Sequence, residues 1–522
     1  MIDTKKEQER DELHRAIWAI ADELRGAVDG WDFKNYVLGT MFYRYISENL
    51  TSYINTGEAE AGNPDFDFAR MSDADAEEAR EGLVEEKGFF ILPSELFCNV
   101  RSKAASDENL NETLERIFRH IEESAKGTSS EGQFAGLFDD FDVNSNKLGA
   151  TVAKRNEKLV KLLNGVADMN LGDVRHHDID AFGDAYEYLM TMYASNAGKS
   201  GGEFFTPADV SELLTRLGTV GKTEINKVYD PACGSGSLLL KAEKVLGRDK
   251  VRNGFFGQEI NITTYNLCRI NMFLHDIEFD KFDIACEDTL TAPQHWDDEP
   301  FELIVSNPPY SIKWAGDENP LLINDPRFAP AGVLAPKSKA DLAFIMHSLS
   351  WLAPNGTAAI VCFPGIMYRG GAEQKIRKYL IDNNYVDCVI QLPSNLFFGT
   401  SIATCIMVLN KGKPDSRVLF IDATNECIKV TNNNKLTQDN IQRIVDTFAG
   451  REEVEHFSHL ASYDEIAGND YNLSVSNYVE AEDTREKVDI AKLNAEISEI
   501  VSREQVLRNE IDKVIAEIEV IG

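Results

Sequence analysis

The chain has 522 residues, which is more than one hydrophobic core usually supports, so its length predicts roughly two to four domains of about 150 residues each. Its composition, 43% hydrophobic and 27% charged, excludes disordered, collagenous and disulfide-rich classes. The 53 Lys and Arg residues against 87 Asp and Glu residues give a net charge of −34, so the overall field of the chain does not favour phosphate backbones. A nucleic-acid substrate would therefore need a local basic patch or a basic partner.

No apolar run approaches the about 18 residues that identify a membrane-spanning helix, and the first residues contain no apolar stretch typical of a signal peptide. The eight cysteines form no Cys-x-x-Cys pair and lie mostly within apolar runs. We therefore expect core cysteines without zinc sites or disulfides. The sequence predicts a cytoplasmic protein that has no membrane contact and no bound metal.

The first third of the chain has helical patterning. Apolar residues recur at helical spacing from Leu13 to Leu24, from Leu114 to Ile121 and from Leu159 to Leu163. These patterns predict an all-helical domain over residues 1–169.

Residues 170–475 alternate short β-rich runs with helical segments. The strands that we expect lie at 228–230, 254–257, 282–284, 303–305 and 358–361. The helices that we expect lie at 237–246, 262–275, 341–353 and 374–382. Alternation at this interval predicts an α/β fold with a doubly wound parallel sheet, covered by helices on both faces. The runs 386–392 and 404–409 are typical of a closing antiparallel pair.

Residues 476–522 form a predicted third unit, a C-terminal helical tail. Apolar residues from Ile490 to Ile521 fall at alternating spacings of three and four, interrupted only by Glu504. Four heptads with charged flanks predict a coiled-coil-like helix that contacts another subunit. An amphipathic helix that packs on its own chain fits the same pattern, and the sequence favours neither interpretation.

A glycine-rich turn, Asp-Pro-Ala-Cys-Gly-Ser-Gly-Ser at 230–237, follows a predicted strand and opens a predicted helix. Gly234 and Gly236 permit a tight turn in which helix N-terminal amides point toward an anionic group. Leu239 replaces the third glycine of a dinucleotide fingerprint, and no Gly-Lys-Ser/Thr follows to make a P-loop. A plain βα turn explains this motif equally well by itself.

Two acidic residues follow the next two predicted strands. Glu259 ends the second strand, where a carboxylate in a doubly wound fold can bind two ribose hydroxyls. Asp288 follows the third strand and is placed to accept from an adenine amino group. Together with the glycine-rich turn, these acids favour an adenosine-containing ligand.

The motif Asn-Pro-Pro-Tyr at 307–310 directly follows an apolar strand. Its two prolines remove amide donors, so a carbonyl and the Asn307 amide oxygen can face one site as acceptors. Two acceptors that hold the hydrogens of an exocyclic amine favour its nucleophilic, tetrahedral form. Tyr310 offers a flat face on which a flipped base can stack. The alternative is a proline-terminated strand with a core tyrosine.

These motifs together resemble class I S-adenosylmethionine-dependent amino methyltransferases of nucleic-acid bases. Gly-Gly-Glu-Phe-Phe-Thr-Pro at 201–207 is similar to the segment that closes over the methionine part of the cofactor in that family. Its position ahead of 230–237 and 307–310 is the order found in N6-adenine enzymes. Over nearly its whole length, including Leu-Pro-Ser-Asn-Leu-Phe-Phe-Gly-Thr at 392–400, the chain resembles the modification subunit of type I restriction-modification systems.

The resemblance implies methyl transfer from S-adenosylmethionine to the N6 amine of adenine in DNA. It also implies a specificity subunit that reads the DNA, a second modification subunit, and restriction subunits that join for cleavage. The target-base residues that it implies are Asn307, Pro308 and Tyr310, with Phe397 or Phe398 as the second stacking face. The cofactor residues that it implies are Glu203, Phe204, Phe205, Thr206, Pro207, Ala208, Asp230, Gly234, Ser235, Gly236, Ser237, Glu259 and Asp288.

Several alternatives remain open from the sequence. Asn-Pro-Pro-Tyr serves any planar amine, so an RNA or protein-glutamine methyltransferase is possible, as is a catalytically idle assembly scaffold. Cys233 is not expected to be a nucleophile, because exocyclic amines need no covalent intermediate. Residues 311–339 are either a DNA-clamping loop or a solvated connector. Their basic residues include Lys313, Arg327, Lys337 and Lys339.

Overall fold

The computed structural model describes residues 4–24, 30–171, 181–196, 206–296, 299–316, 319–397, 401–430, 433–481 and 490–521. The chain divides into two compact units, Met1–Val479 and Glu480–Gly522. Within the described ranges, no helix is long and apolar enough to cross a membrane. The domain divisions predicted after residues 169 and 475 remain predictions.

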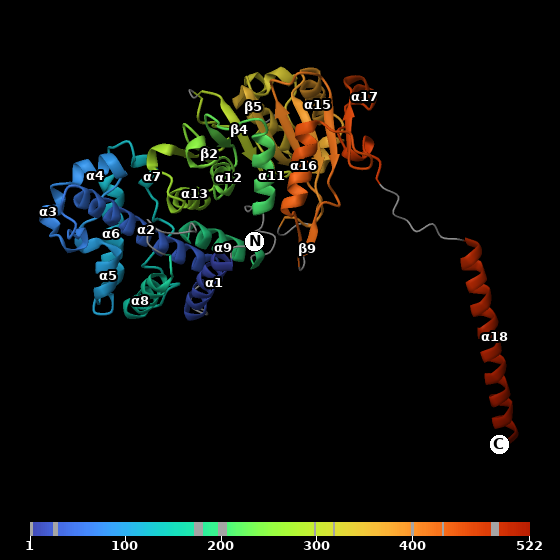
Figure 1. Ribbon diagram of the computed structural model, residues 1–522, viewed down its shortest axis with the longest axis horizontal. Helices are drawn as coiled ribbons and strands as arrows, with labels where there is room; N and C mark the ends of the chain where they lie inside the picture. Colours follow the sequence, from blue (N-terminus) through green and yellow to red (C-terminus); the bar gives the residue numbers. More distant parts are fainter. Residues whose placement is uncertain are drawn as a thin grey trace. The chain divides into compact units, whose positions relative to one another are not determined.

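The first part of the larger unit is helical, as the apolar spacing predicts (Figure 1). Its α-helices are α1 (Thr4–Leu24), α2 (Gly30–Glu60), α3 (Asp73–Glu77), α4 (Arg80–Lys87), α5 (Phe97–Ala104), α6 (Leu110–Ser124), α7 (Glu131–Phe134), α8 (Val152–Asp168) and α9 (Ala181–Asn196). Aromatic rings fill much of their core: Phe118 stacks on Phe138 with centroids 4.4 Å apart, and Tyr43 meets Phe118 edge-on at 5.4 Å. Such pairs add stability beyond the burial of their surface.

The second part of the larger unit is built on a sheet of nine strands. In chain order the strands are β1 (Val228–Asp230), β2 (Phe255–Glu259), β3 (Phe282–Cys286), β4 (Phe301–Ser306), β5 (Leu352–Cys362), β6 (Val386–Gln391), β7 (Cys405–Asn410), β8 (Val418–Asp422) and β11 (Ser458–Ala461). The order across the sheet is β11-β8-β6-β7-β5-β4-β1-β2-β3. All five strands predicted from the apolar runs are present, and β1 to β5 pair in parallel.

Helices cover both faces of this sheet, which confirms the doubly wound α/β fold. One face packs against α11 (Ala208–Gly218), α12 (Ser237–Leu246), α13 (Ile262–Leu274) and α16 (Gln438–Gly450), and the other against α14 (Asp341–Trp351), α15 (Ala372–Asp382) and α17 (Tyr463–Gly468). Successive β4 residues alternate between the two cores: Leu303 and Val305 belong to the first, and Ile304 belongs to the second. This alternation is the period of two that a strand imposes.

The antiparallel pair predicted at 386–392 and 404–409 exists as β6 and β7, but it does not close the sheet. The sheet continues through β8, which pairs in parallel with β6, to β11. A small hairpin of β9 (Ile428–Val430) and β10 (Asn433–Lys435) follows β8. The buried apolar run of β8 was the available signal for this extension.

The helical part packs on the sheet part through α13, which lies beside α7 (Figure 1). The buried Arg269 side chain donates to three backbone carbonyls across this contact, those of Gly132 (3.0 Å), Gln133 (3.2 Å) and Ala135 (2.9 Å). Asn266 Nδ2 also donates to Asp140 Oδ2 (2.9 Å). Because buried donors and acceptors are costly to leave unpaired, these bonds fix the two parts against each other.

The smaller unit contains one helix, α18 (Ile490–Ile521), among its described residues. Its 32 residues confirm the helical tail predicted from the apolar stripe. The stripe is exposed to solvent: Ile490 is 69% exposed, and Ile500 and Ile518 are each 66% exposed.

Candidate functional site

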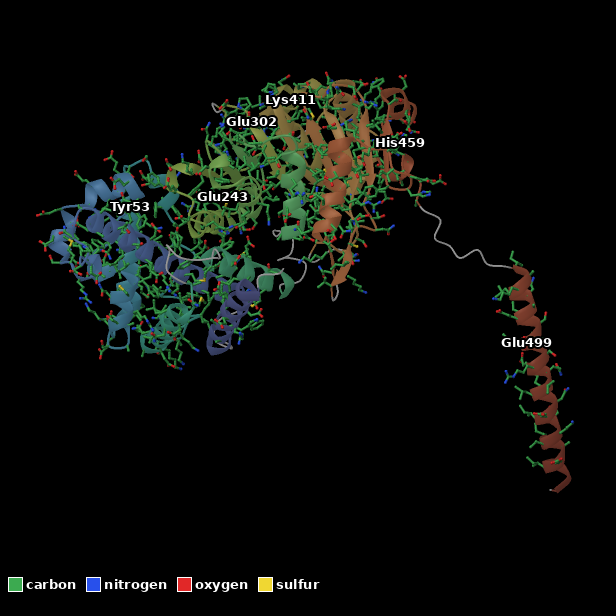
Figure 2. All side chains as sticks on the ribbon, viewed as in Figure 1. Tyr53, Glu243, Glu302, Lys411, His459 and Glu499 are labelled. Atoms are coloured by element: carbon green, nitrogen blue, oxygen red, sulfur yellow. The ribbon has the colours of Figure 1, made fainter. Side chains whose placement is uncertain are left out.

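A cavity lies at the edge of the sheet where the parallel strands β1 to β4 end. Glu302 and Lys411, labelled in Figure 2, mark the opposite edge of the sheet. At that opposite edge, Lys411 Nζ donates to the carbonyl of Leu352 (2.6 Å), the first residue of β5. Ligand sites in open α/β sheets characteristically occupy the carboxyl edge. The predicted site residues that line the cavity are Thr206, Asp230, Gly234, Ser235, Ser237, Glu259, Asp288 and Asn307.

The glycine-rich turn between β1 and α12 has the backbone that its glycines predict. Gly234 and Gly236 have φ of 54° and 80°, in the left-handed region that favours glycine. The backbone N–H of Gly236 donates to the carbonyl of Cys233 (2.8 Å), which closes the turn. A Cβ on Gly236 would lie 2.8 Å from Cys268 Sγ, so a larger residue would push the turn away from α13.

Asp230 ends β1 and is fully buried at the cavity wall. Its Oδ1 accepts from Ser306 Oγ (2.7 Å) and from the backbone N–H of Ala232 (2.9 Å). Its Oδ2 accepts no hydrogen bond from the described residues. Burial raises the pKa of the Asp230 carboxyl to about 7. An unpaired buried acceptor of this kind fits a ligand that brings a positive charge or an N–H donor.

Glu259 links the turn after β1 to the turn after β2. Its carboxylate accepts from the backbone N–H of Gly234 (3.1 Å) through Oε2 and from that of Asn261 (2.8 Å) through Oε1. Burial raises the pKa of Glu259. Each carboxylate oxygen keeps a second acceptor position, so the pair can still bind two hydroxyls as predicted.

Asp288 holds the loop that follows β3. Its carboxylate accepts from the backbone N–H of Leu290 (2.9 Å) and from Thr291 Oγ1 (2.8 Å). Thr289 Oγ1 donates to the carbonyl of Pro231 (2.6 Å), so the third loop is tied to the first turn. Ile260 lies on the same cavity with 69% of its surface exposed, and it offers the apolar face that a purine would need.

Both polar atoms of the Asn307 side chain form hydrogen bonds. Its Nδ2 donates to Thr206 Oγ1 (3.1 Å), and its Oδ1 accepts from the Tyr310 hydroxyl. An amide oxygen has two lone pairs, so Oδ1 retains one acceptor position, and Asn307 is among the residues that line the cavity. Tyr310 is half-buried and packs on the core, and burial raises the pKa of its hydroxyl well above the ordinary value.

The other predicted site residues lie away from the cavity lining or outside the described residues. Pro207 is the N-cap of α11, Ala208 is its first residue, and Pro308 is buried beside Asn307. Phe397 is 4% exposed and belongs to the core that contains β6, so its stacking role remains a prediction. The predicted residues outside the described ranges are Glu203, Phe204, Phe205 and Phe398.

Cys233 lines the cavity, but its thiol is not activated as a nucleophile. A hydrogen bond with Cys268, and then burial, raises the pKa of the Cys233 thiol well above its ordinary value. A thiol rather than a thiolate is a poor nucleophile. The interpretation of Cys233 as part of a cofactor-binding turn remains a prediction.

Residues 177–487 match the family described as N-6 DNA Methylase. The chain belongs to this family. Residues 13–166 match the family described as HsdM N-terminal domain. These matches confirm the adenine-N6 DNA methylase function predicted from the motifs.

Relatives of the family cover almost the whole chain. The methylase subunit of the type I restriction enzyme MpnII from Mycoplasma pneumoniae is 50% identical, over 99% of this chain and 98% of that protein. The structure of the type I restriction-modification system methyltransferase subunit from Streptococcus thermophilus superposes with a TM-score of 0.79 at 36% identity, covering 90% of this chain and 100% of that one. A chain from a structure of type I complex assembly has a TM-score of 0.65 at 19% identity and supports the fold.

The roles of two residues beside this cavity were not predicted from the sequence. Asp341, the first residue of α14, accepts from the backbone N–H of Ser311 through both oxygens (3.2 and 3.0 Å) and fixes the turn after Asn-Pro-Pro-Tyr. Ser311 has a φ of 51°, so this turn is strained and depends on its partner. Arg327 is buried behind the cavity. The position of Asp341 at the start of a predicted helix was a signal for an anchoring role, whereas Arg327 gave none.

Proposed function

We propose that this chain binds S-adenosylmethionine in the cavity and methylates adenine N6 in DNA as the modification subunit of a type I complex. The observation that carries the proposal is the meeting of Asp230, Glu259 and Asn307 on one cavity. When bound, S-adenosylmethionine supplies the methyl group on its sulfonium sulfur. Asp230 Oδ2 suits the cationic part, Glu259 the ribose hydroxyls, and Asp288 with Ile260 the adenine.

The residues of the acceptor motif would then act on the target amine. Asn307 Oδ1 and the carbonyl of Pro308 would accept the two N–H groups of adenine N6, and so hold its lone pair toward the methyl group. As the new C–N bond forms, the bond between the methyl carbon and the sulfonium sulfur would break, and its electron pair would stay on sulfur, which leaves as a neutral thioether. Positive charge would develop on the nitrogen, and these two acceptors would stabilise it. The nitrogen then loses one proton to water. Because the acceptors gain strength only as charge develops, they accelerate the reaction rather than tighten substrate binding.

The net charge of the chain and the names of its relatives support assembly with other subunits. A net charge of −34 gives the chain little general attraction for DNA, so a specificity subunit would supply most of the DNA contacts. The relatives are named as subunits of type I restriction enzymes. A second modification subunit and restriction subunits would complete the complex, which we expect in the cytoplasm. The exposed stripe of α18 offers a surface for one of these contacts.

The experiment offers DNA, RNA and a glutamine-containing protein extract as methyl acceptors. The chain is incubated with a specificity subunit and S-adenosylmethionine carrying a labelled methyl group, and label is counted in each acceptor. We expect label in DNA alone. Label in RNA or protein would favour the amine-methylating alternatives, and absence of both cofactor binding and transfer would favour a scaffold.

A further inference from the structure

Arg327, in the loop between β4 and α14, is 2% exposed and uses all five N–H donors of its guanidinium group. Nε donates to Asp325 Oδ1 (3.0 Å) and Nη2 to Asp325 Oδ2 (2.7 Å). Nη1 donates to the carbonyl of Thr289 (2.8 Å), and Nη2 donates to that of Leu290 (2.8 Å). The remaining Nη1 donor faces His347 Nδ1 at 3.1 Å. Arg327 is therefore not free to contact DNA phosphates, as a clamping loop would require.

The two carbonyls that Arg327 holds belong to the loop of the cavity. Thr289 and Leu290 both line the cavity, directly after Asp288. The same loop is tied to the turn after β1 by the bond from Thr289 Oγ1 to the carbonyl of Pro231 (2.6 Å). Arg327 thus supports, from behind, the segment that would face the adenine of the cofactor.

His347 completes the support as a neutral acceptor. It is fully buried on α14, and its Nε2 lies 2.9 Å from the hydroxyl of Tyr229, the residue before Asp230. Burial, and then the nearby charge of Arg327, lowers the pKa of His347 well below its ordinary value. A neutral imidazole can accept from Arg327 at Nδ1 while it donates to Tyr229 from Nε2. The support therefore reaches from the loop after β3 to the end of β1.

Lysine could not replace this arginine without loss. Lysine has three donors on a single nitrogen, whereas the five acceptors around Arg327 surround a planar fork. Arg269 provides a matched comparison within the chain, because it is also buried and donates to three backbone carbonyls, but at the contact between the helical part and α13. Both arginines are buried and donate to backbone carbonyls, but Arg327 contacts the loop that lines the cavity, whereas Arg269 contacts the helical part.

We propose that Arg327 is a positioning residue for the cofactor, which holds the backbone of Thr289 and Leu290 in the shape that binds the adenine end. This inference rests on the proposed function, since it assumes that S-adenosylmethionine occupies the cavity. It assigns to the loop at 311–339 a role in the cofactor site that neither predicted interpretation of this loop included.

The experiment compares Arg327→Lys with Arg269→Lys in the full chain. Calorimetry with S-adenosylmethionine should give about tenfold weaker binding for Arg327→Lys, the loss expected when a hydrogen-bonded support is broken, and unchanged binding for Arg269→Lys. In the complex with the specificity subunit, the KM for S-adenosylmethionine should rise by about tenfold for Arg327→Lys while kcat at saturation stays within about twofold, because only cofactor binding is affected. Both variants should lower the melting temperature.

Three results would overturn the inference. Unchanged affinity in Arg327→Lys would make the residue purely structural, and equal weakening in Arg269→Lys would make the effect a general destabilisation. If Arg327→Lys does not fold, the variant Tyr229→Phe is measured instead, because it removes only the hydroxyl that His347 contacts. This variant should bind S-adenosylmethionine about twofold to threefold more weakly. Unchanged affinity in that variant would also contradict the inference. Failure of the wild-type chain to bind S-adenosylmethionine would instead overturn the proposed function.

Discussion

Asp230 should make the affinity for S-adenosylmethionine depend on pH. Burial raises the pKa of this carboxyl to about 7, so below pH 7 the free protein mainly holds the protonated form. A cationic ligand favours the ionised form, and binding then releases a proton. Affinity should therefore rise by up to about tenfold per pH unit toward pH 7, while the amino group of the cofactor, with a pKa of about 7.8, remains charged.

Calorimetry between pH 5.5 and 7.0 checks this expectation. The variant Asp230→Asn has no titrating carboxyl at position 230, so its affinity should be lower and should depend on pH less than that of the wild-type chain. An affinity of the wild-type chain that falls as pH rises would contradict the role of Asp230.

Glu259 should contribute directly to cofactor binding. Glu259→Ala removes both acceptors for the ribose and should weaken S-adenosylmethionine binding by about 1–3 kcal/mol, through loss of charge-assisted hydrogen bonds. Titration calorimetry measures this change, with Glu287→Ala as a control, because Glu287 is exposed and lies outside the cavity lining. Unchanged affinity in Glu259→Ala would remove Glu259 from the site.

Asn307 and Tyr310 should separate chemistry from cofactor binding. Asn307→Ala should abolish methyl transfer with cofactor affinity nearly intact, because the lost oxygen acts on the target amine. Tyr310→Phe loses the bond to Asn307 Oδ1 but keeps its ring, so it should retain most activity, whereas Tyr310→Ala should not. The measurement is the rate of methyl transfer at saturating cofactor. Equal loss in both tyrosine variants would refute stacking as the main role of Tyr310.

At the scale of single residues, the sequence predicted side chains that act near their own motif. Glu259 ends β2, Asn307 directly follows β4, and Gly234 lies in the turn after β1; parallel strands bring such positions to one edge without further information. The contacts of Arg327 could not be predicted, because its partners Thr289 and Leu290 lie almost forty residues earlier and no local sequence pattern indicates that contact. The bond from Tyr310 to Asn307 was missed because a stacking role was assigned to the ring alone.

At the scale of elements, strand positions followed from apolar runs bounded by turns, but sheet order did not. The pair β6 and β7 was correctly paired, yet its place inside the sheet depends on β8 and β11, which pair through contacts distant in sequence. The predicted helix at 341–353 ends at Trp351, and β5 begins at Leu352, because the backbone there enters the sheet beside Phe301. Boundaries between elements are set by such pairing rather than by local preference.

The helix α18 should serve assembly rather than cofactor binding. Its apolar stripe is exposed, and a chain truncated before Arg485 lacks it while keeping the whole cavity lining. We expect the truncated chain to bind S-adenosylmethionine normally and to lose its complex with the specificity subunit, as measured by light scattering after gel filtration. A complex that is unaltered by truncation would assign the stripe to packing within the chain.

At the scale of the whole molecule, the net charge leads us to expect that catalysis and DNA recognition belong to different subunits. The chain provides a cavity suited to a cationic cofactor, while its net charge of −34 opposes general attraction to phosphate. The isolated chain should therefore bind DNA weakly and methylate it slowly, and a specificity subunit should restore both. Robust site-specific methylation by the chain alone would contradict this division of labour.

The most direct test of the central claim is nucleoside analysis of DNA after reaction. The complex of chain and specificity subunit is incubated with DNA and S-adenosylmethionine carrying a deuterated methyl group, and the digested DNA is analysed by mass spectrometry. We expect deuterated N6-methyladenine with the wild-type chain and none with Asn307→Ala. Label in N4-methylcytosine, or undiminished N6-methyladenine with Asn307→Ala, would contradict it.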